Sequence, residues 1–219
     1  VEAYLVDDLK DMIVNPKGQH LNDRYVVFDL ETTGFSAKSD KIIEIGAVKV
    51  ENGKIIDRFS TFVNPEIPIP FRIEKLTSIN DEMVIDAPKI EEILPQFMEF
   101  CKDSVMVAHN SDFDMSFIEA NCKRQDLECD FTVIDTVAMS RYLIIGLGRY
   151  KLDNVAKALG IVLDHHHRAV DDAECTALIF LKLCKMLEGK GIDNLDELNR
   201  QGKQSKNLID KLPAHHAII

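Results

Sequence analysis

One short apolar run limits most strongly what this chain can fold into. Residues 25–31, YVVFDLE, are too few for a buried helix, so they predict a central strand covered on both faces. Side chains two apart on a strand point the same way, which places Asp29 and Glu31 on one face. Burying two carboxylates costs free energy unless they are paired or bound to metal. We therefore expect a functional site where this strand ends.

The segments that follow predict an antiparallel meander and then strand–helix units. Residues 41–50 and 54–63 read as strands, and Asn52-Gly53 between them is a strong hairpin signal. This order predicts an α/β fold with a mixed five-stranded sheet, three antiparallel strands first, flanked by helices. The ribonuclease H-like architecture has the same order. The later elements are expected as helical pieces over 71–86, helices over 88–101, 113–125, 151–160 and 169–188, and strands over 104–110 and 132–137.

The chain reads as one domain, residues 25–188, with a segment on each side. Residues 1–24 carry the turn signal NPKG and predict a flanking segment outside the main core. Residues 189–219 are polar and glycine-bearing, with one weak helix near 193–200, and predict a C-terminal linker. The chain starts with Val1 and stops within an apolar run, so we expect a piece of a longer polypeptide.

Two aspartates follow the fourth predicted strand, and they compete for a functional role. Asp112 fits a helix N-cap, whereas Asp114 lies three residues before Phe117, on its inward face. On the residues alone, a functional and a structural role for Asp114 are about equally supported. His109 and Asn110 end a strand, and they could form a turn or face a substrate.

Helical geometry separates two adjacent aspartates in the last long helix. At about 100° per residue, Asp172 falls at the edge of the apolar stripe and can reach the sheet. Asp171 faces away and favours the helix N-terminus through its charge. The stripe consists of Ala173, Thr176, Ala177, Phe180, Cys184 and Leu187.

Three consecutive histidines, 165–167, precede this helix and raise the alternative of a zinc site. Adjacent residues cannot all face one metal in an ordinary backbone, so structural zinc is the weaker alternative. Only His167 stands just before the helix that carries Asp172, and the other two read as loop residues. With an ordinary pKa near ~6.5, His167 suits a general base for water.

Four carboxylates in one place repel one another strongly unless divalent cations neutralise them. The strand end supplies Asp29 and Glu31, and two helices supply Asp114 and Asp172. A histidine beside such a cluster completes the equipment for phosphodiester hydrolysis with two divalent ions, Mg²⁺ or Mn²⁺.

The bulk composition qualifies this hypothesis. The formal net charge of −11 argues against strong unaided binding to long nucleic acid. A nuclease that acts on terminal nucleotides needs little basic surface, because its metals supply local positive charge. No run approaches the roughly 20 apolar residues of a membrane span, so we expect no membrane partner. The five cysteines form no CxxC pair, which fits a reducing cytoplasm.

Three motifs in order, FDLETTG, VAHNSDFD and HRAVDDAE, closely resemble as a set those of the DnaQ-like (DEDDh) 3′–5′ exonuclease family. The resemblance covers most of the chain. It implies that Asp29, Glu31 and Asp172 ligate a first metal. Asp29 would also bridge to a second metal, held partly through water by Asp114. His167 would deprotonate the attacking water.

The same resemblance implies a pocket for the terminal nucleotide. Phe35 and Leu76 could be ordinary core or could wedge against a terminal base, since stacking on an apolar side chain tolerates any sequence. The other candidate substrate-binding residues are Thr32, Thr33, Gly34, His109, Asn110 and Phe113.

The flanks resemble, more loosely, the joins around the proofreading exonuclease of PolC-type bacterial DNA polymerase III alpha chains. The matching stretches are AYLVDDLKDMIVNP before the domain and GIDNLDELNRQ after it. This resemblance implies a frayed or single-stranded DNA 3′ end as substrate, nucleoside 5′-monophosphates as products, and the remainder of a replicative polymerase chain as partner.

Two alternatives stay open. A free-standing exonuclease of the same fold could act on RNA or in DNA repair, and equal or faster trimming of RNA would favour it. A recruitment module could keep the fold and lose catalysis. Such a module needs no intact carboxylate set, and here none of the five catalytic positions is replaced.

Overall fold

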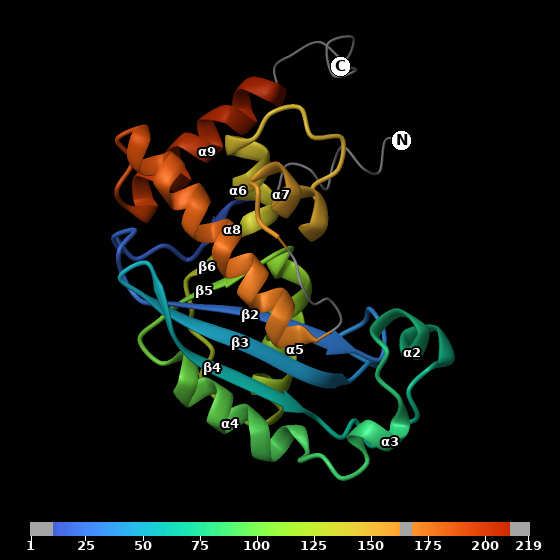
Figure 1. Ribbon diagram of the computed structural model, residues 1–219. Helices are drawn as coiled ribbons and strands as arrows, with labels where there is room; N and C mark the ends of the chain where they lie inside the picture. Colours follow the sequence, from blue (N-terminus) through green and yellow to red (C-terminus); the bar gives the residue numbers. More distant parts are fainter. Residues whose placement is uncertain (1–10, 163–167, 211–219) are drawn as a thin grey trace.

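The computed structural model describes residues 11–162 and 168–210. Its centre is a mixed six-stranded sheet in the order β1-β6-β5-β2-β3-β4 (Figure 1). β2, β3 and β4 pair antiparallel, while β5 runs parallel to β2 and β6 parallel to β5. The α/β class and the meander followed by strand–helix units are therefore confirmed. The strands are β1 (Ile13–Val14), β2 (Tyr25–Thr32), β3 (Ile42–Glu51), β4 (Lys54–Phe62), β5 (Val105–Ala108) and β6 (Val133–Asp135).

Helices cover both faces of the sheet. α8 crosses one face and α5 lies behind the other (Figure 1). Among the described residues, none of the helices combines the length and apolarity needed to cross a membrane. The helices are α2 (Phe71–Thr77), α3 (Asp81–Val84), α4 (Ile90–Cys101), α5 (Ser111–Arg124), α6 (Thr136–Leu143), α7 (Leu152–Ala158), α8 (Ala169–Gly189) and α9 (Leu195–Asp210).

Side chains alternate along β2 and divide the core into two layers. Val26, Phe28 and Leu30 belong to the apolar cluster buried under α4 and α5. Tyr25 and Val27 point the other way, into the cluster buried under α8. The next two side chains on that second face are the predicted pair of carboxylates. The α8 side of β2 thus changes from apolar to acidic where the strand ends.

The hairpin between β3 and β4 forms as predicted. Asn52 has φ 51° and Gly53 has φ 73°, so both residues adopt the left-handed conformation. A two-residue turn of this kind matches the twist of antiparallel strands. The turn joins β3 directly to β4 and fixes the register of that antiparallel pair.

The structure of the N-terminal flank differs from two predictions. Ile13 and Val14 form β1, which pairs antiparallel with β6, so the sheet has six strands rather than five. Met12, Ile13 and Leu21 are buried in the α8-side cluster, so these residues do not lie outside the main core. A two-residue strand is too short to show the alternation by which strands are recognised in sequence.

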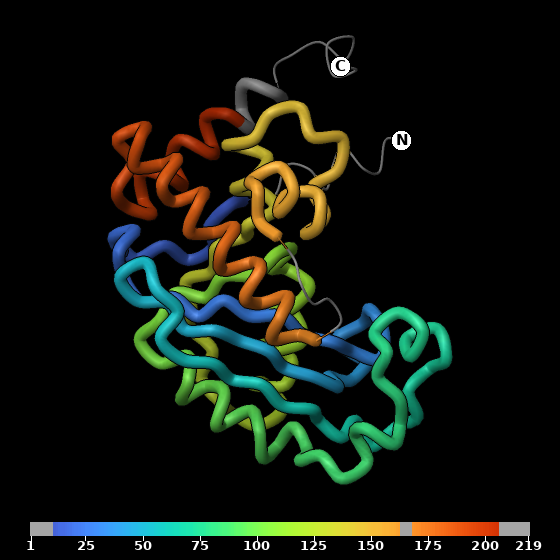
Figure 2. Tube along the Cα trace, in the orientation of Figure 1, coloured from blue at the N-terminus to red at the C-terminus, as the bar shows by residue number. Residues whose placement is uncertain are grey.

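The C-terminal flank is also packed rather than a free linker over its first part. Ile192, Leu195 and Leu198 are buried in the same cluster. The Leu21 amide donates to the Asp193 carbonyl at 2.9 Å, and the stretches of chain around these two residues run side by side (Figure 2). The linker prediction is therefore wrong for this stretch, while the domain limits at 25 and 188 stay a prediction.

Candidate active site

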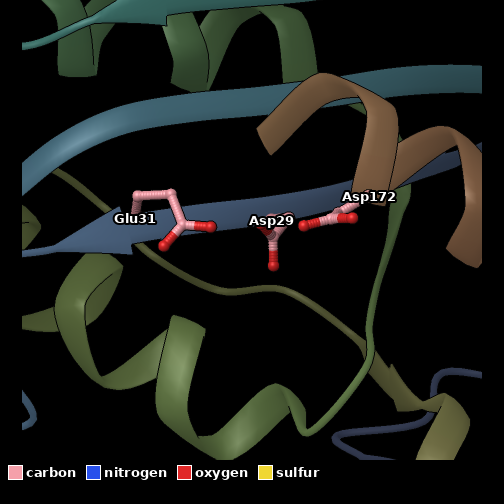
Figure 3. A group of neighbouring side chains, drawn as sticks. All are labelled: Asp29, Glu31 and Asp172. Atoms are coloured by element: carbon pink, nitrogen blue, oxygen red, sulfur yellow. The ribbon is translucent and has the colours of Figure 1, made fainter. Parts of the chain in front are cut away.

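Three carboxylates meet where β2 ends beside the first turn of α8. Each of Asp29, Glu31 and Asp172 offers an oxygen, and these oxygens all lie within 4.8 Å of one another. Figure 3 shows Asp29 and Glu31 on β2, with Asp172 reaching the strand from α8. All three side chains are partly buried. The predicted convergence of residues far apart in the sequence is confirmed for this group.

The amphipathic pattern of α8 explains why Asp172, and not Asp171, joins the cluster. The predicted apolar stripe is buried from Ala173 to Leu187. Because that stripe packs on β2 and β3, a residue at its edge in the first turn lies directly over the sheet. Among the described residues, the group of possible metal ligands includes Asp172 and leaves Asp171 out.

Asp114 reaches β2 from the opposite side. It lies in the first turn of α5, with 3% of its surface exposed, and its Oδ1 accepts a hydrogen bond from the Leu30 amide at 3.1 Å. The Leu30 amide lies between the two strand carboxylates, beyond Val27, the last β2 residue that pairs with β5. The inward orientation of Asp114 is confirmed. Asp112 is not the N-cap as predicted, because α5 begins earlier, after Asn110 in a left-handed conformation with φ 68°.

The carboxylates of this cluster repel one another. Burial raises the pKa of Asp29 well above its ordinary value, and Asp114, Glu31 and Asp172 raise it further. The pKa of Glu31 rises to about 7, first through burial and then through Asp172 and Glu44. Burial also raises the pKa of Asp114, against the Leu30 hydrogen bond that lowers it. A proton or a cation among these oxygens would relieve this repulsion.

The donor set fits a divalent cation. Asp29 Oδ2 is buried and meets no hydrogen-bond donor among the described residues. Hard divalent ions such as Mg²⁺ bind carboxylate oxygens and usually keep several waters. A cation at this place would pair with the orphaned oxygen and offset the repulsion that raises the pKa values. Asp29, Glu31 and Asp172 are therefore suited to hold such an ion.

The two predicted histidines differ in what the structure says of them. His167 lies outside the described residues. His109 is partly buried, with Nδ1 2.8 Å from Thr136 Oγ1 and Nε2 2.8 Å from the Tyr150 carbonyl. A carbonyl only accepts, so Nε2 carries the proton and both ring nitrogens are engaged within the protein. His109 thus holds the loop that contains Tyr150, and its contact with substrate stays a prediction.

The residues after β2 form a turn closed by one aspartate. Thr33 Oγ1 donates to Asp40 Oδ1 at 3.1 Å and accepts from the Lys41 amide at 2.9 Å. Thr32 Oγ1 donates to the Gly34 carbonyl at 2.6 Å. A Cβ on Gly34 would lie 2.5 Å from the Asp40 carboxylate, so a larger residue here would displace that carboxylate from Thr33. The two threonine hydroxyls are buried and shape the turn, and their role toward a nucleotide stays a prediction.

Apolar side chains stand exposed beside this turn. Phe35 is 70% exposed and Leu76 on α2 is 68% exposed. The rings of Phe35 and Phe113 lie 6.3 Å apart, and the Arg72 guanidinium lies 5.8 Å from the Phe35 ring centroid. The alternative that Phe35 and Leu76 are ordinary core is therefore wrong. Both side chains are exposed, and their contact with a terminal base stays a prediction. Asn110 is exposed as well, at the start of α5.

One charged residue beside the cluster was not singled out in the sequence. Glu44 of β3 is completely buried, and it pairs with Arg168, whose Nε lies 2.8 Å from Glu44 Oε1. A signal existed, because Glu44 interrupts an apolar strand and a fully buried carboxylate is rare without a partner. The sequence could not name that partner, which lies 124 residues away.

The sequence of this chain matches known proteins along its length. Residues 26–180 match the family model described as Exonuclease. The chain belongs to this exonuclease family. It is also 50% identical over its full length to the DNA polymerase III PolC-type of Clostridium perfringens and 48% identical to that of Caldanaerobacter subterraneus. The chain spans 15% and 16% of those relatives, so it corresponds to a small part of each.

The fold of this exonuclease-family chain matches solved nuclease structures. One is Exonuclease X in complex with 5′ overhanging duplex DNA, with 29% identity and a TM-score of 0.59. The match covers 76% of this chain and 93% of that one. The family resemblance carried by the three motifs and the ribonuclease H-like fold class predicted from the order of the elements are confirmed, and the chain is a nuclease domain.

Proposed function

We propose that this chain removes nucleotides one at a time from the 3′ end of DNA and releases nucleoside 5′-monophosphates. The observation that carries the proposal is the meeting of Asp29, Glu31 and Asp172 at one point, with Asp114 behind them, in a chain of the exonuclease family. A pair of divalent ions, Mg²⁺ or Mn²⁺, would neutralise the phosphate charge and make bound water more acidic.

The protein's own residues then hold and orient the reactants. Asp29, Glu31 and Asp172 would hold the ions. Asp114 is fixed by its bond to the Leu30 amide, and it would help to hold the ions. The terminal nucleotide would lie against the exposed Phe35, supported by the neighbouring Phe113 ring. Apolar contact of this kind accepts any base, as an exonuclease requires.

His167 is the proposed general base. It precedes by two residues the helix that delivers Asp172, and it would take a proton from the attacking water. Replacing His167 with alanine should slow turnover by roughly 10²–10⁴ and leave divalent-ion affinity nearly unchanged. Calorimetry that showed lost Mn²⁺ affinity in that variant would contradict the role.

We further propose that the domain proofreads within a larger polymerase chain in the cytoplasm. Its relatives by sequence are named DNA polymerase III PolC-type and are much longer than this chain. A chain of net charge −11 binds DNA weakly by itself, so the rest of the polymerase would bring the primer end. A mismatched end unpairs at a lower free-energy cost, so it would reach the site more often than a paired end.

The test uses a 5′-labelled DNA primer with a 3′ mismatch, incubated with Mg²⁺ or with EDTA. Wild type should shorten the primer stepwise from its 3′ end only when Mg²⁺ is present, and Asp172→Ala should not. Asp171→Ala is the matched control, because it removes the same charge one position away. Cleavage by wild type in EDTA would contradict the proposal, as would full activity of Asp172→Ala.

The substrate class is tested with the same sequence made as RNA. We expect DNA to be trimmed faster, which separates a polymerase proofreader from a free-standing exoribonuclease. Equal or faster trimming of the RNA strand would overturn the DNA assignment and leave the nuclease assignment in place.

A further inference from the structure

Glu44 of β3 forms hydrogen bonds with the first turn of α8. Glu44 Oε1 accepts hydrogen bonds from Arg168 Nε at 2.8 Å and from the Ala169 amide at 3.3 Å. An amide in the first helical turn has no acceptor within the helix, so Glu44 supplies one. The Arg168 guanidinium also lies 4.3 Å from the ring centroid of Phe62, on β4. The start of α8 is therefore bonded to the sheet through side chains.

Gly46 brings the backbone of the same turn against the strand. A Cβ on Gly46 would lie 2.0 Å from the Val170 nitrogen and 2.2 Å from the Ala169 carbonyl carbon. Those are backbone atoms of a helix and cannot rotate away as a side chain could. Only glycine at this position lets α8 approach β3 so closely. We call Glu44 and Gly46 together the α8 docking site.

The register of the sheet places the docking site beside the proposed metal ligands. Glu44 pairs with Glu31 across the strands, and Gly46 pairs with Asp29. Partners opposite each other in a sheet point to the same face. The docking site and the two strand carboxylates therefore lie next to each other, on the face that α8 covers.

The first turn of α8 links the docking site to Asp172. The Asp172 amide donates to the Arg168 carbonyl at 3.2 Å, which closes one helical turn. Any shift or tilt of Arg168 and Ala169 is thus carried to Asp172 by the helix backbone. One carboxylate oxygen from each of Asp29, Glu31 and Asp172 lies within 4.8 Å of the other two, so a small displacement of α8 would separate these ligand atoms.

The position of the Glu44 carboxylate is unfavourable for the stability of the fold. It is directly opposite another carboxylate, Glu31, which destabilises a sheet. Its Oε2 is buried and meets no donor among the residues that the structure describes. Glu44 is not one of the described residues whose oxygens group as possible metal ligands. Because this buried carboxylate is unfavourable for the stability of the sheet, we infer that it has a role other than packing.

We propose that Glu44 is a positioning residue for the metal site: with Gly46 it docks the first turn of α8 and so sets Asp172 at ligand distance from Asp29 and Glu31. This inference rests on the proposed metal-dependent nuclease function. Removing residues that orient metal ligands commonly lowers metal affinity or activity by about 10- to 100-fold. The docking site should behave as such a support.

The first experiment compares Glu44→Ala and Glu44→Gln with wild type by calorimetric titration of Mn²⁺. Glutamine keeps an oxygen that can accept from Arg168 and Ala169, whereas alanine does not. We expect Mn²⁺ affinity to fall about 10- to 100-fold in Glu44→Ala and to recover to within a few-fold of wild type in Glu44→Gln. Wild-type affinity in Glu44→Ala would overturn the proposal. Equal losses in both variants would also overturn it, because charge and not docking would then matter.

A matched control exists on the same helix. Glu174 of α8 pairs with Arg58 of β4 at 3.1 Å, and both side chains are partly exposed. This contact also joins α8 to the sheet, but it lies beyond the first turn. Glu174→Gln should leave Mn²⁺ affinity unchanged. A loss as large as that of Glu44→Ala would show that any weakening of α8 matters, and it would overturn the specific role of Glu44.

Gly46→Ala is a second and independent variant. It keeps the Glu44 carboxylate but pushes the first turn of α8 away, so it should lower Mn²⁺ affinity as Glu44→Ala does. Gly189→Ala, at the far end of α8 where a Cβ meets nothing within 4 Å, is its control. Amide exchange should quicken at Ala169 in Glu44→Ala and in Gly46→Ala, while thermal unfolding confirms that each variant is folded. Unchanged Ala169 exchange with lost affinity would contradict docking.

The outcomes also separate this inference from the proposed function. If wild type binds Mn²⁺ and degrades DNA while Glu44→Ala equals it, only the positioning role fails. If wild type itself binds no divalent ion, the proposed function fails and the positioning role with it.

Discussion

The two faces of β2 solve the problem of burial in different ways. On the α4 and α5 face, Val26, Phe28 and Leu30 are buried among apolar side chains, and nothing more is needed to satisfy them. On the α8 face, the apolar pattern ends in Asp29 and Glu31, whose pKa values are raised by burial and by their neighbours. One face stabilises the fold, and the other uses that stability to hold a cluster that repels itself. A substitution on the α8 face should therefore lower activity without lowering stability. A substitution on the α4 and α5 face should lower stability and leave the metal site intact.

The largest effect is expected from Asp29→Asn. It removes the carboxylate that the other acids surround, so we expect activity to fall by about 10⁴-fold, or roughly 5 kcal/mol of transition-state stabilisation. The same change relieves repulsion, so the metal-free protein should become more stable, as active-site substitutions often do. Single-turnover kinetics and thermal unfolding in EDTA measure the two effects. A variant that is both active and less stable would contradict the contrast between the faces.

Phe28→Ala tests the apolar face one position away. The Phe28 side chain is 1% exposed, and its ring lies 5.9 Å from that of Phe97. Truncation of a buried phenylalanine costs about 3–5 kcal/mol of unfolding free energy. Denaturant unfolding measures this loss. At a temperature where the variant is folded, its Mn²⁺ affinity should remain within a few-fold of wild type. A large loss of affinity in the folded variant would show that the faces are not independent.

Added Mn²⁺ should stabilise the proteins that keep all metal ligands, and this gain in stability is expected to be smaller than the effects above. At about 100 times its dissociation constant, an ion that binds only the folded state adds about 2.7 kcal/mol of stability. Wild type and Phe28→Ala should both gain this amount, whereas Asp29→Asn should gain much less. Melting curves with and without Mn²⁺ make the comparison. Equal stabilisation of all three proteins would place the ion elsewhere.

The last prediction concerns the dependence of stability on pH in the absence of metal. The pKa of Glu31 is raised from 4.5 to about 7, so the folded state holds this proton more tightly than the unfolded chain does. Its contribution to stability is therefore fully present below about pH 4.5 and is lost as the pH rises to about 7. The melting temperature in EDTA should fall over this range, and less so in Glu31→Gln. Identical pH slopes for the two proteins would refute the assignment.

The sequence predicted most elements because each carries a local signal. The short apolar run of β2, the Asn52-Gly53 turn and the apolar stripe of α8 all depend on residues close together in the chain. The separation of Asp172 from Asp171 followed from helical geometry alone. By contrast, β1 has too few residues for a pattern, and the burial of Leu21 and Ile192 depends on contacts with distant segments.

What the amino-acid sequence by itself determined is the kind of chemistry: acids at the ends of apolar segments, and motifs in the order of an exonuclease. Only the tertiary structure decided which of these acids share one site and what holds them there. The role of Glu44 is the clearest case, because its hydrogen bonds to Arg168 and Ala169 join β3 to a helix 124 and 125 residues further on. Such a contact arises from the register of the sheet and the packing of α8, which no local pattern encodes.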